Sequence, residues 1–188
     1  EMNDIIRLMV GRELTNQFPP KTNVPGDVYL KVEGLTGMHN HLKDVSFEAR
    51  RGEILGLAGL DASGRTEVLE SIFGLRERKE GFIALDDNPC FNRTPRESIK
   101  NGFALLTEER RATGIFGVLD IKANTVISSL DRHKRFGVYL SEKTQREDTQ
   151  FYIDAMRTKT PSQETKIRSL SGGNQQKVII GRWLLTDP

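Results

Sequence analysis

The first half of the chain carries the alternation and the apolar runs that are typical of β-strands. Residues 28–35 (VYLKVEGL) and 45–49 (VSFEA) place apolar side chains at alternate positions, which predicts strands with one buried face. Residues 54–60 (ILGLAGL) are continuously apolar, which predicts a strand buried on both faces. Residues 81–87 and 102–109 complete the set of predicted strands.

Apolar residues at helical spacing lie between and after these strands. The pattern predicts a helix that follows a glycine-rich loop at residues 59–66, and further helices in residues 95–102, 121–160 and 169–185. Another helical stripe occupies residues 4–14. Strands that alternate with helices are typical of an α/β fold.

The stretch between the first helix and the first strand has the composition of a linker. Residues 17–27 (QFPPKTNVPGD) contain three prolines and one glycine. We therefore expect residues 4–14 to be the last helix of a preceding domain. A long surface loop within a single domain is the alternative interpretation.

The composition limits the classes of function. Lys and Arg number 28 and Asp and Glu number 26, so the net charge of +2 does not indicate a nucleic-acid partner. Cys90 is the only cysteine, which rules out an intrachain disulfide. No apolar run approaches the roughly 20 residues of a membrane-spanning helix, so we expect no direct membrane insertion. The function has to be inferred from motifs.

The first motif is the glycine-rich loop Gly59–Thr66, which follows the template G-x-x-x-x-G-K-[ST] except that Arg65 replaces lysine. Such glycines let successive backbone N–H groups point at a phosphate, and the following helix adds its positive end. A helix start that merely requires glycines is the alternative. The positions expected to contact a nucleotide are Gly59, Asp61, Ala62, Ser63, Gly64, Arg65, Thr66 and Glu67.

Two residues of this loop predict weak binding. Arg65 carries a planar guanidinium group instead of the compact ammonium group of lysine, so the geometry of its contact with a phosphate differs. Asp61 places a carboxylate in a loop that should hold an anion. At about 5 Å and an effective dielectric constant of about 20, two like charges repel by a few kcal/mol.

The second motif is LSGGNQQK, residues 170–177, in which a Ser-Gly-Gly turn opens a helix. The turn presents N–H groups and a hydroxyl to an anion. A plain helix cap is the alternative interpretation. The candidate nucleotide-binding residues here are Ser171, Gly172, Gly173 and Asn174.

Together the two motifs resemble the ATPase domains of ABC transporters. LSGGNQQK resembles the signature motif of the sugar-importer ATPases, and GLDASGRTE resembles the altered P-loop of the second of their two fused domains. The stretches TEERRATGIF and MRTKTP resemble those of the sugar-importer ATPases that serve galactose and methyl galactosides. The resemblance implies the α/β P-loop fold of the ABC type, a mixed sheet with a P-loop helix and a helical subdomain.

The resemblance also implies roles for particular residues. The P-loop would bind ATP, with Thr66 and Glu108 as Mg²⁺ ligands; Glu108 stands where other ABC proteins have a glutamine that couples to the permease. Ser171, Gly172 and Gly173 would face the P-loop of the other ATPase domain. The implied partners are that second domain, membrane permease subunits and, indirectly, a sugar-binding protein. The implied location is the cytoplasmic face of the bacterial membrane.

The resemblance divides the chain into four parts. They are the tail of a preceding domain with its linker (1–26), the nucleotide-binding core (27–118), the helical subdomain (119–168), and the signature turn with its helix (169–188). The strand with the Mg²⁺-binding Asp and the catalytic Glu (Walker B), and the later switch His, would follow. We therefore expect a fragment with no catalytic residue of its own, and an exposed apolar sheet edge that promotes self-association.

Two other functions fit parts of the sequence. An ABC-type ATPase that acts on nucleic acid or ribosomes would normally carry strongly basic segments, whereas this chain has only short ones such as residues 132–135 (RHKR). A P-loop kinase of small molecules would leave the Ser-Gly-Gly turn unexplained. Nucleotide-dependent dimerisation separates the kinase from the importer ATPase.

Overall fold

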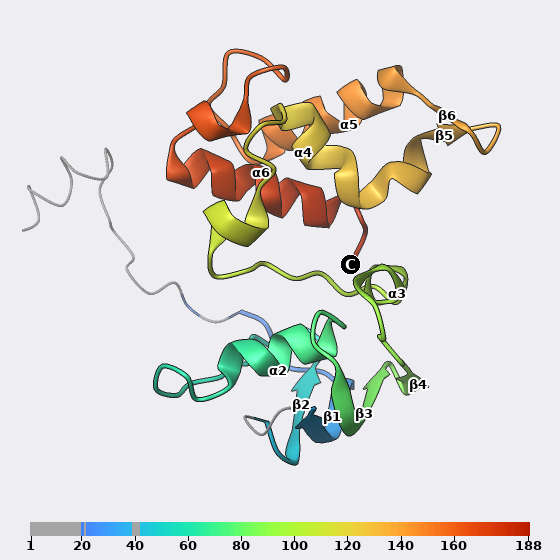
Figure 1. The fold of residues 1–188 in the computed structure, drawn as a ribbon, viewed down its shortest axis with the longest axis vertical. Coiled ribbons are helices and arrows are strands. Elements are labelled where there is room, and N and C mark those ends of the chain that lie inside the picture. Colours follow the sequence, from blue (N-terminus) through green and yellow to red (C-terminus); the bar gives the residue numbers. More distant parts are fainter. Residues whose placement is uncertain (1–19, 21, 39–41) are drawn as a thin grey trace, which may run out of the picture.

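A computed structural model describes residues 20, 22–38 and 42–188, arranged as a sheet layer and a helical layer (Figure 1). The helix predicted at 4–14 and part of the predicted linker lie outside the described residues. A four-stranded antiparallel sheet has the order β2-β1-β3-β4. Its strands are β1 (Val28–Gly37), β2 (Val45–Arg50), β3 (Arg78–Leu85) and β4 (Asn88–Pro89).

The P-loop helix α2 (Arg65–Ile72) covers one face of this sheet. Val32 of β1 and Ile83 of β3 lie on that face, and the irregular pairing between Val32 and Leu35 brings Leu35 to the same face. These three side chains form a buried core with Val68 and Ile72 of the helix. Val68 and Ile72 are four residues apart, so they lie on one face of the helix. Leu69 is 44% exposed and lies outside this core.

A close approach between β1 and β3 requires glycine at position 81. Gly81 has φ +127°, and a Cβ atom built there would lie 2.8 Å from the Cα atom of Leu35. The pairing of the two strands is irregular in the same region, between Glu33 and Thr36. Glycine is the residue that fits this backbone conformation without a clash.

The helical layer has its own buried core. Its elements are α4 (Ile121–Val126), a 3₁₀ helix (Ile127–His133), α5 (Glu142–Ala155), a 3₁₀ turn (Ile167–Ser169) and α6 (Gly172–Leu184). Asp120 and Ser141 cap α4 and α5, accepting hydrogen bonds from Ala123 N and Thr144 N. The core residues are Ile121, Ile153, Ile167, Leu170 and Val178.

Two segments join the layers. Helix α3 (Pro95–Lys100) lies between them in Figure 1, with Thr94 as its N-cap. Arg93 N donates to Glu97 Oε2 at 2.8 Å, which holds the start of the helix to the preceding residue. A π-helical turn, Arg110–Gly114, then leads into the helical layer.

The strands predicted at 54–60 and 102–109 are wrong as strands in this structure. Residues 53–60 and 103–106 carry no helix or strand, and Ile54 is 95% exposed. A buried parallel strand needs neighbours on both sides for its backbone groups, and in the described residues neither segment pairs with a strand. The apolar run has the composition of a buried strand, but composition alone does not show whether neighbouring strands pair with it.

The predicted helical stretch 121–160 also contains a β-hairpin, β5 (Lys134–Arg135) and β6 (Tyr139–Leu140), that the sequence analysis did not predict. The helical pattern of residues 169–185 predicts that Val178, Ile179 and Leu184 face a core. Val178 and Ile179 are buried, whereas Leu184 is 42% exposed and its neighbour Leu185 is buried instead. In the part of the chain that the structure describes, no helix combines the length and the apolar character needed to cross a bilayer.

Candidate functional site

The glycine-rich loop turns the chain from the extended segment 53–58 into α2. A Cβ atom at Gly59 would lie 2.5 Å from Ser63 Oγ, so the curl of the loop leaves no space for a side chain there. Ala62 and Gly64 have φ values of 61° and 94°, and Ser63 N donates to Leu60 O at 3.1 Å. The loop is therefore a tight, backbone-lined turn of the kind that binds phosphate.

The N-terminus of α2 receives no hydrogen bond from a capping side chain. Gly64 is the N-cap, and it has no side chain to offer to the first N–H groups of the helix. Uncapped N–H groups together with the positive end of an eight-residue helix favour an anion at this position.

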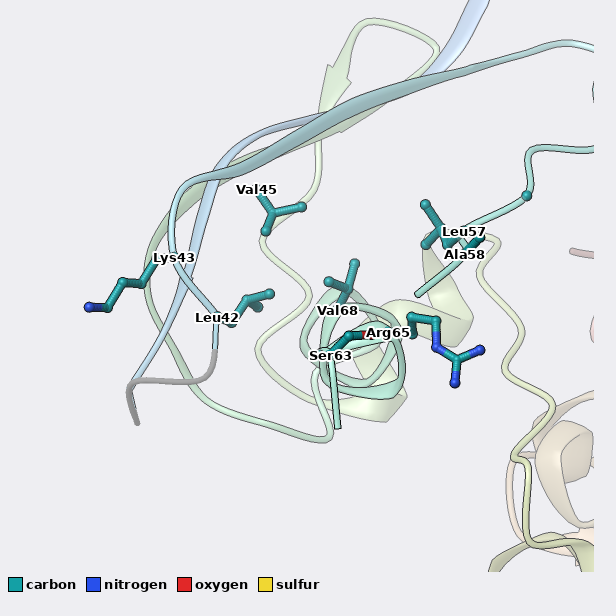
Figure 2. A pocket seen from close by; sticks show the side chains of 10 residues that line it. Leu42, Lys43, Val45, Leu57, Ala58, Ser63, Arg65 and Val68 are labelled. Carbon is teal, nitrogen blue, oxygen red and sulfur yellow. The ribbon is translucent and has the colours of Figure 1, made fainter. Parts of the chain in front are cut away.

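A cavity of about 600 Å³ lies beside the loop (Figure 2). In Figure 2 the ammonium of Lys43 points away from α2, whereas the guanidinium of Arg65 extends on the opposite side, near Leu57 and Ala58. Of these two cations, Arg65 is therefore the one that belongs to the glycine-rich loop. The cavity is lined by Leu42, Lys43, Val45, Gly56, Leu57, Ala58, Ser63, Gly64, Arg65 and Val68.

Arg65 has a carboxylate partner inside the same loop. Arg65 Nη2 lies 3.4 Å from Asp61 Oδ1, and the Asp61 side chain is fully exposed. An exposed pair of this kind contributes little to stability, about 0–1 kcal/mol. Its importance is electrostatic, because Asp61 partly neutralises the cation that the sequence assigns to the phosphate.

Thr66 and Glu108 both line a second cavity, of about 590 Å³. Arg65 and Glu109 line the same cavity, which lies between α2 and residues 105–113. A hydroxyl and carboxylates are the hard oxygen ligands that Mg²⁺ prefers, and Mg²⁺ usually takes only one or two carboxylates from the protein. The residues therefore fit the metal predicted for them. Glu67 instead directs its carboxylate to Arg76, at 3.9 Å.

The Ser-Gly-Gly turn lies in the helical layer, at the start of α6. Ser171 is the N-cap but makes no side-chain capping bond; its Oγ accepts from Asn174 Nδ2 at 3.0 Å. Asn174 Oδ1 accepts from Lys159 N at 3.0 Å, so this asparagine fixes the turn to the preceding loop. None of the described residues 171–174 lines either of the two cavities beside the P-loop.

The sequence analysis missed two arginines, the first of which contacts this turn. A Cβ atom at Gly172 would lie 2.5 Å from Arg110 Nη2, so the Arg110 guanidinium rests directly on the turn. Arg110 follows the predicted Glu108 by two residues, which was an available signal.

The second missed residue, Arg182, is 5% exposed. It bonds to residues on two other segments: Nε to Asn124 O at 2.6 Å, Nη1 to Gly114 O at 2.8 Å and Nη2 to Asn124 Oδ1 at 3.0 Å. Burial lowers the pKa of Arg182 to about 10, so it stays charged at neutral pH. Arg182 thereby fastens the π-helical turn and α4 to the helix that carries the Ser-Gly-Gly turn.

Comparison with known proteins gives the family of these motifs. Residues 42–188 match the model of the ABC transporter family, ABC_tran. The chain is 58% identical over 189 aligned residues to the galactose/methyl galactoside import ATP-binding protein MglA of Vibrio vulnificus, and 56% identical over 185 residues to the MglA protein of Fusobacterium nucleatum. The matches cover 100% and 98% of this chain but 38% and 37% of those proteins.

Solved structures show the same fold. A nucleotide-free ATP-binding cassette from an ABC transporter superposes with a TM-score of 0.70 at 20% identity, covering 86% of this chain and 66% of that one. The ATP-binding cassette MJ0796 in a dimeric post-hydrolysis state bound to ADP and Pi superposes with a TM-score of 0.66 at 21% identity, covering 85% and 70%. These likenesses confirm the fold class predicted from the sequence.

Proposed function

Because the chain belongs to the ABC transporter family, we propose that it is part of the ATP-binding subunit of an ABC importer for a monosaccharide. The observation that carries the proposal is the identity of 58% along the whole chain to a galactose/methyl galactoside import ATP-binding protein. Galactose or a methyl galactoside is accordingly the proposed cargo. The chain spans 38% of the length of that relative, so the proposal concerns a longer protein to which this segment contributes.

In this proposal the two motifs serve different ATP molecules. The P-loop binds Mg-ATP weakly, because Asp61 pairs with Arg65 and because the guanidinium of Arg65 replaces the usual lysine ammonium. Thr66 and Glu108 hold the Mg²⁺, which neutralises phosphate charge when bound. The Ser171–Gly173 turn lines neither of these cavities and completes the ATP site of a second ATPase domain.

The proposed partners follow from the same division. A second ATPase domain contacts the Ser-Gly-Gly turn, permease subunits convert closure of the ATP sites into transport, and a sugar-binding protein delivers the cargo. The proposed location is the cytoplasmic face of the cell membrane, at its periphery.

A segment exchange tests this function. The matched segment of the Vibrio vulnificus protein is replaced by this chain, and ATP-dependent uptake of labelled methyl galactoside is measured in cells that lack their own importer ATPase. We expect uptake in the exchanged protein, and its loss when Gly172→Arg blocks the turn. Correctly folded exchanged protein that binds its permease but supports no uptake would contradict the proposal.

A further inference from the structure

The hairpin β5–β6 presents apolar side chains to solvent at its tip. It extends beyond the helices at the edge of the helical layer (Figure 1). Phe136 is 95% exposed, Val138 77% and Tyr139 74%, and Leu140 is also exposed. Contiguous exposed apolar side chains on an otherwise polar surface mark a contact with another molecule.

The backbone of the tip makes Phe136 a poor choice for stability. Val138 N donates to Arg135 O at 3.3 Å across the turn, and the central residues Phe136 and Gly137 have φ values of 51° and 75°. Asn-Gly is the favoured pair for a turn with two positive φ values. A large aromatic residue in the left-handed region is strained, because its Cβ atom crowds the following carbonyl oxygen. A residue that breaks a local rule while its side chain stays almost fully exposed points to a role outside the fold.

Cations flank the apolar tip, and no carboxylate lies within it. Residues 132–140 (RHKRFGVYL) contain three Lys or Arg residues and no Asp or Glu. Arg135 pairs across the hairpin with Tyr139, so a guanidinium and a phenol share one rung. Neighbouring carboxylates offset part of the charge, since Asp131 bonds to Lys134 and Asp148 lies 3.6 Å from Arg132.

We propose that the hairpin Lys134–Leu140 binds the anionic surface of a lipid bilayer. Phe136 and Tyr139 enter the headgroup region, where amphipathic aromatic rings are favoured, and Arg135 contacts lipid phosphates. The tip of two-residue strands is narrow, whereas a stable protein interface takes about 800 Å² from each partner. The inference concerns surface attachment, goes beyond the proposed function and does not rest on it.

Vesicle flotation of the chain tests the proposal without nucleotide or permease. We expect the chain to float with phosphatidylcholine vesicles that contain phosphatidylglycerol, to stay behind with pure phosphatidylcholine, and to be released by high salt. Phe136→Asn removes the aromatic ring and suits the turn, so we expect binding to fall about tenfold with no loss of thermal stability. Arg135→Gln should weaken binding about fivefold.

Matched variants separate this contact from nonspecific adsorption. Phe151→Gln removes another apolar side chain, 63% exposed on α5, and should leave binding unchanged. Phe136→Trp should keep or strengthen it. The proposal is overturned if the chain does not float with anionic vesicles, which would leave the tip as a protein contact. It is equally overturned if Phe136→Asn binds as well as the original chain.

Discussion

Substitution of Arg182 by lysine removes the guanidinium group that joins α6 to α4 and to the π-helical turn Arg110–Gly114. The guanidinium donates to Gly114 O, to Asn124 O and to Asn124 Oδ1. Lysine keeps the charge but has a single donor atom, which cannot reproduce three bonds that diverge from a planar group. The substitution therefore takes side-chain donors away from Gly114 O and Asn124 O, whereas Asn124 Oδ1 keeps its bond from Phe116 N at 2.9 Å.

The cost follows from the number of bonds that are lost. A hydrogen bond to a charged group contributes about 1.5–3 kcal/mol, so losing two of three would cost roughly 3–6 kcal/mol, and partial repair by the lysine brings our expectation to about 3 kcal/mol. In a chain of 188 residues this lowers the melting temperature by about 6–12 °C. Within the described residues Arg182 forms no ion pair, so the loss should be the same at low and high salt.

Thermal and urea unfolding, followed by circular dichroism and by fluorescence of the only tryptophan, Trp183, measure this cost. Arg168→Lys is the matched control, because Arg168 is exposed on the turn before α6. A loss below about 0.5 kcal/mol, or a loss that salt abolishes, would refute the inference that bonds to carbonyl groups make Arg182 structural.

Three further predictions concern other sites. Gly81→Ala should cost on the order of 2–3 kcal/mol in urea unfolding, because its Cβ would meet Leu35. Burial lowers the pKa of His133, so the unfolded chain binds the extra proton and stability should fall as pH drops below about 6.5, measured as a falling melting temperature. The exposed Ile54 should promote self-association, visible as a mass that rises with concentration in light scattering and falls in Ile54→Glu.

Each of these has a control or an opposing result. Gly56→Ala, where an added Cβ meets nothing within 4 Å, should be neutral; equal losses at positions 56 and 81 would show that the clash with Leu35 is not the cause. The pH slope should shrink in His133→Gln, and an unchanged slope would assign it to other groups. A constant monomer mass at high concentration would contradict the self-association.

The parts of the fold that the sequence predicted are those with local signals. The spacing of Gly59 and Gly64, the apolar stripe through Val68 and Ile72, and the Ser-Gly-Gly turn each specify an element over a few residues. The candidate site residues could be proposed for the same reason, since phosphate-binding loops are contiguous in sequence, and they stay predictions.

The parts that could not be predicted depend on distant partners. The run 54–60 has the composition of a buried strand, but a strand forms only where neighbours bond to its backbone. Arg182 shares a helical face with Val178 and Ile179, so its phase indicated burial, yet its acceptors lie 58 and 68 residues away. The hairpin has two-residue strands, too short for an alternation pattern to detect.

A titration of this chain with a fluorescent ATP analogue and Mg²⁺, beside the Arg65→Lys variant, shows whether this P-loop is a weakened nucleotide site. We expect the original chain to stay unsaturated at about millimolar nucleotide, whereas the variant should gain at least about tenfold in affinity from a lysine that reaches the phosphates. Saturation of the original chain at micromolar nucleotide would contradict the claim that Arg65, paired with Asp61, weakens this P-loop.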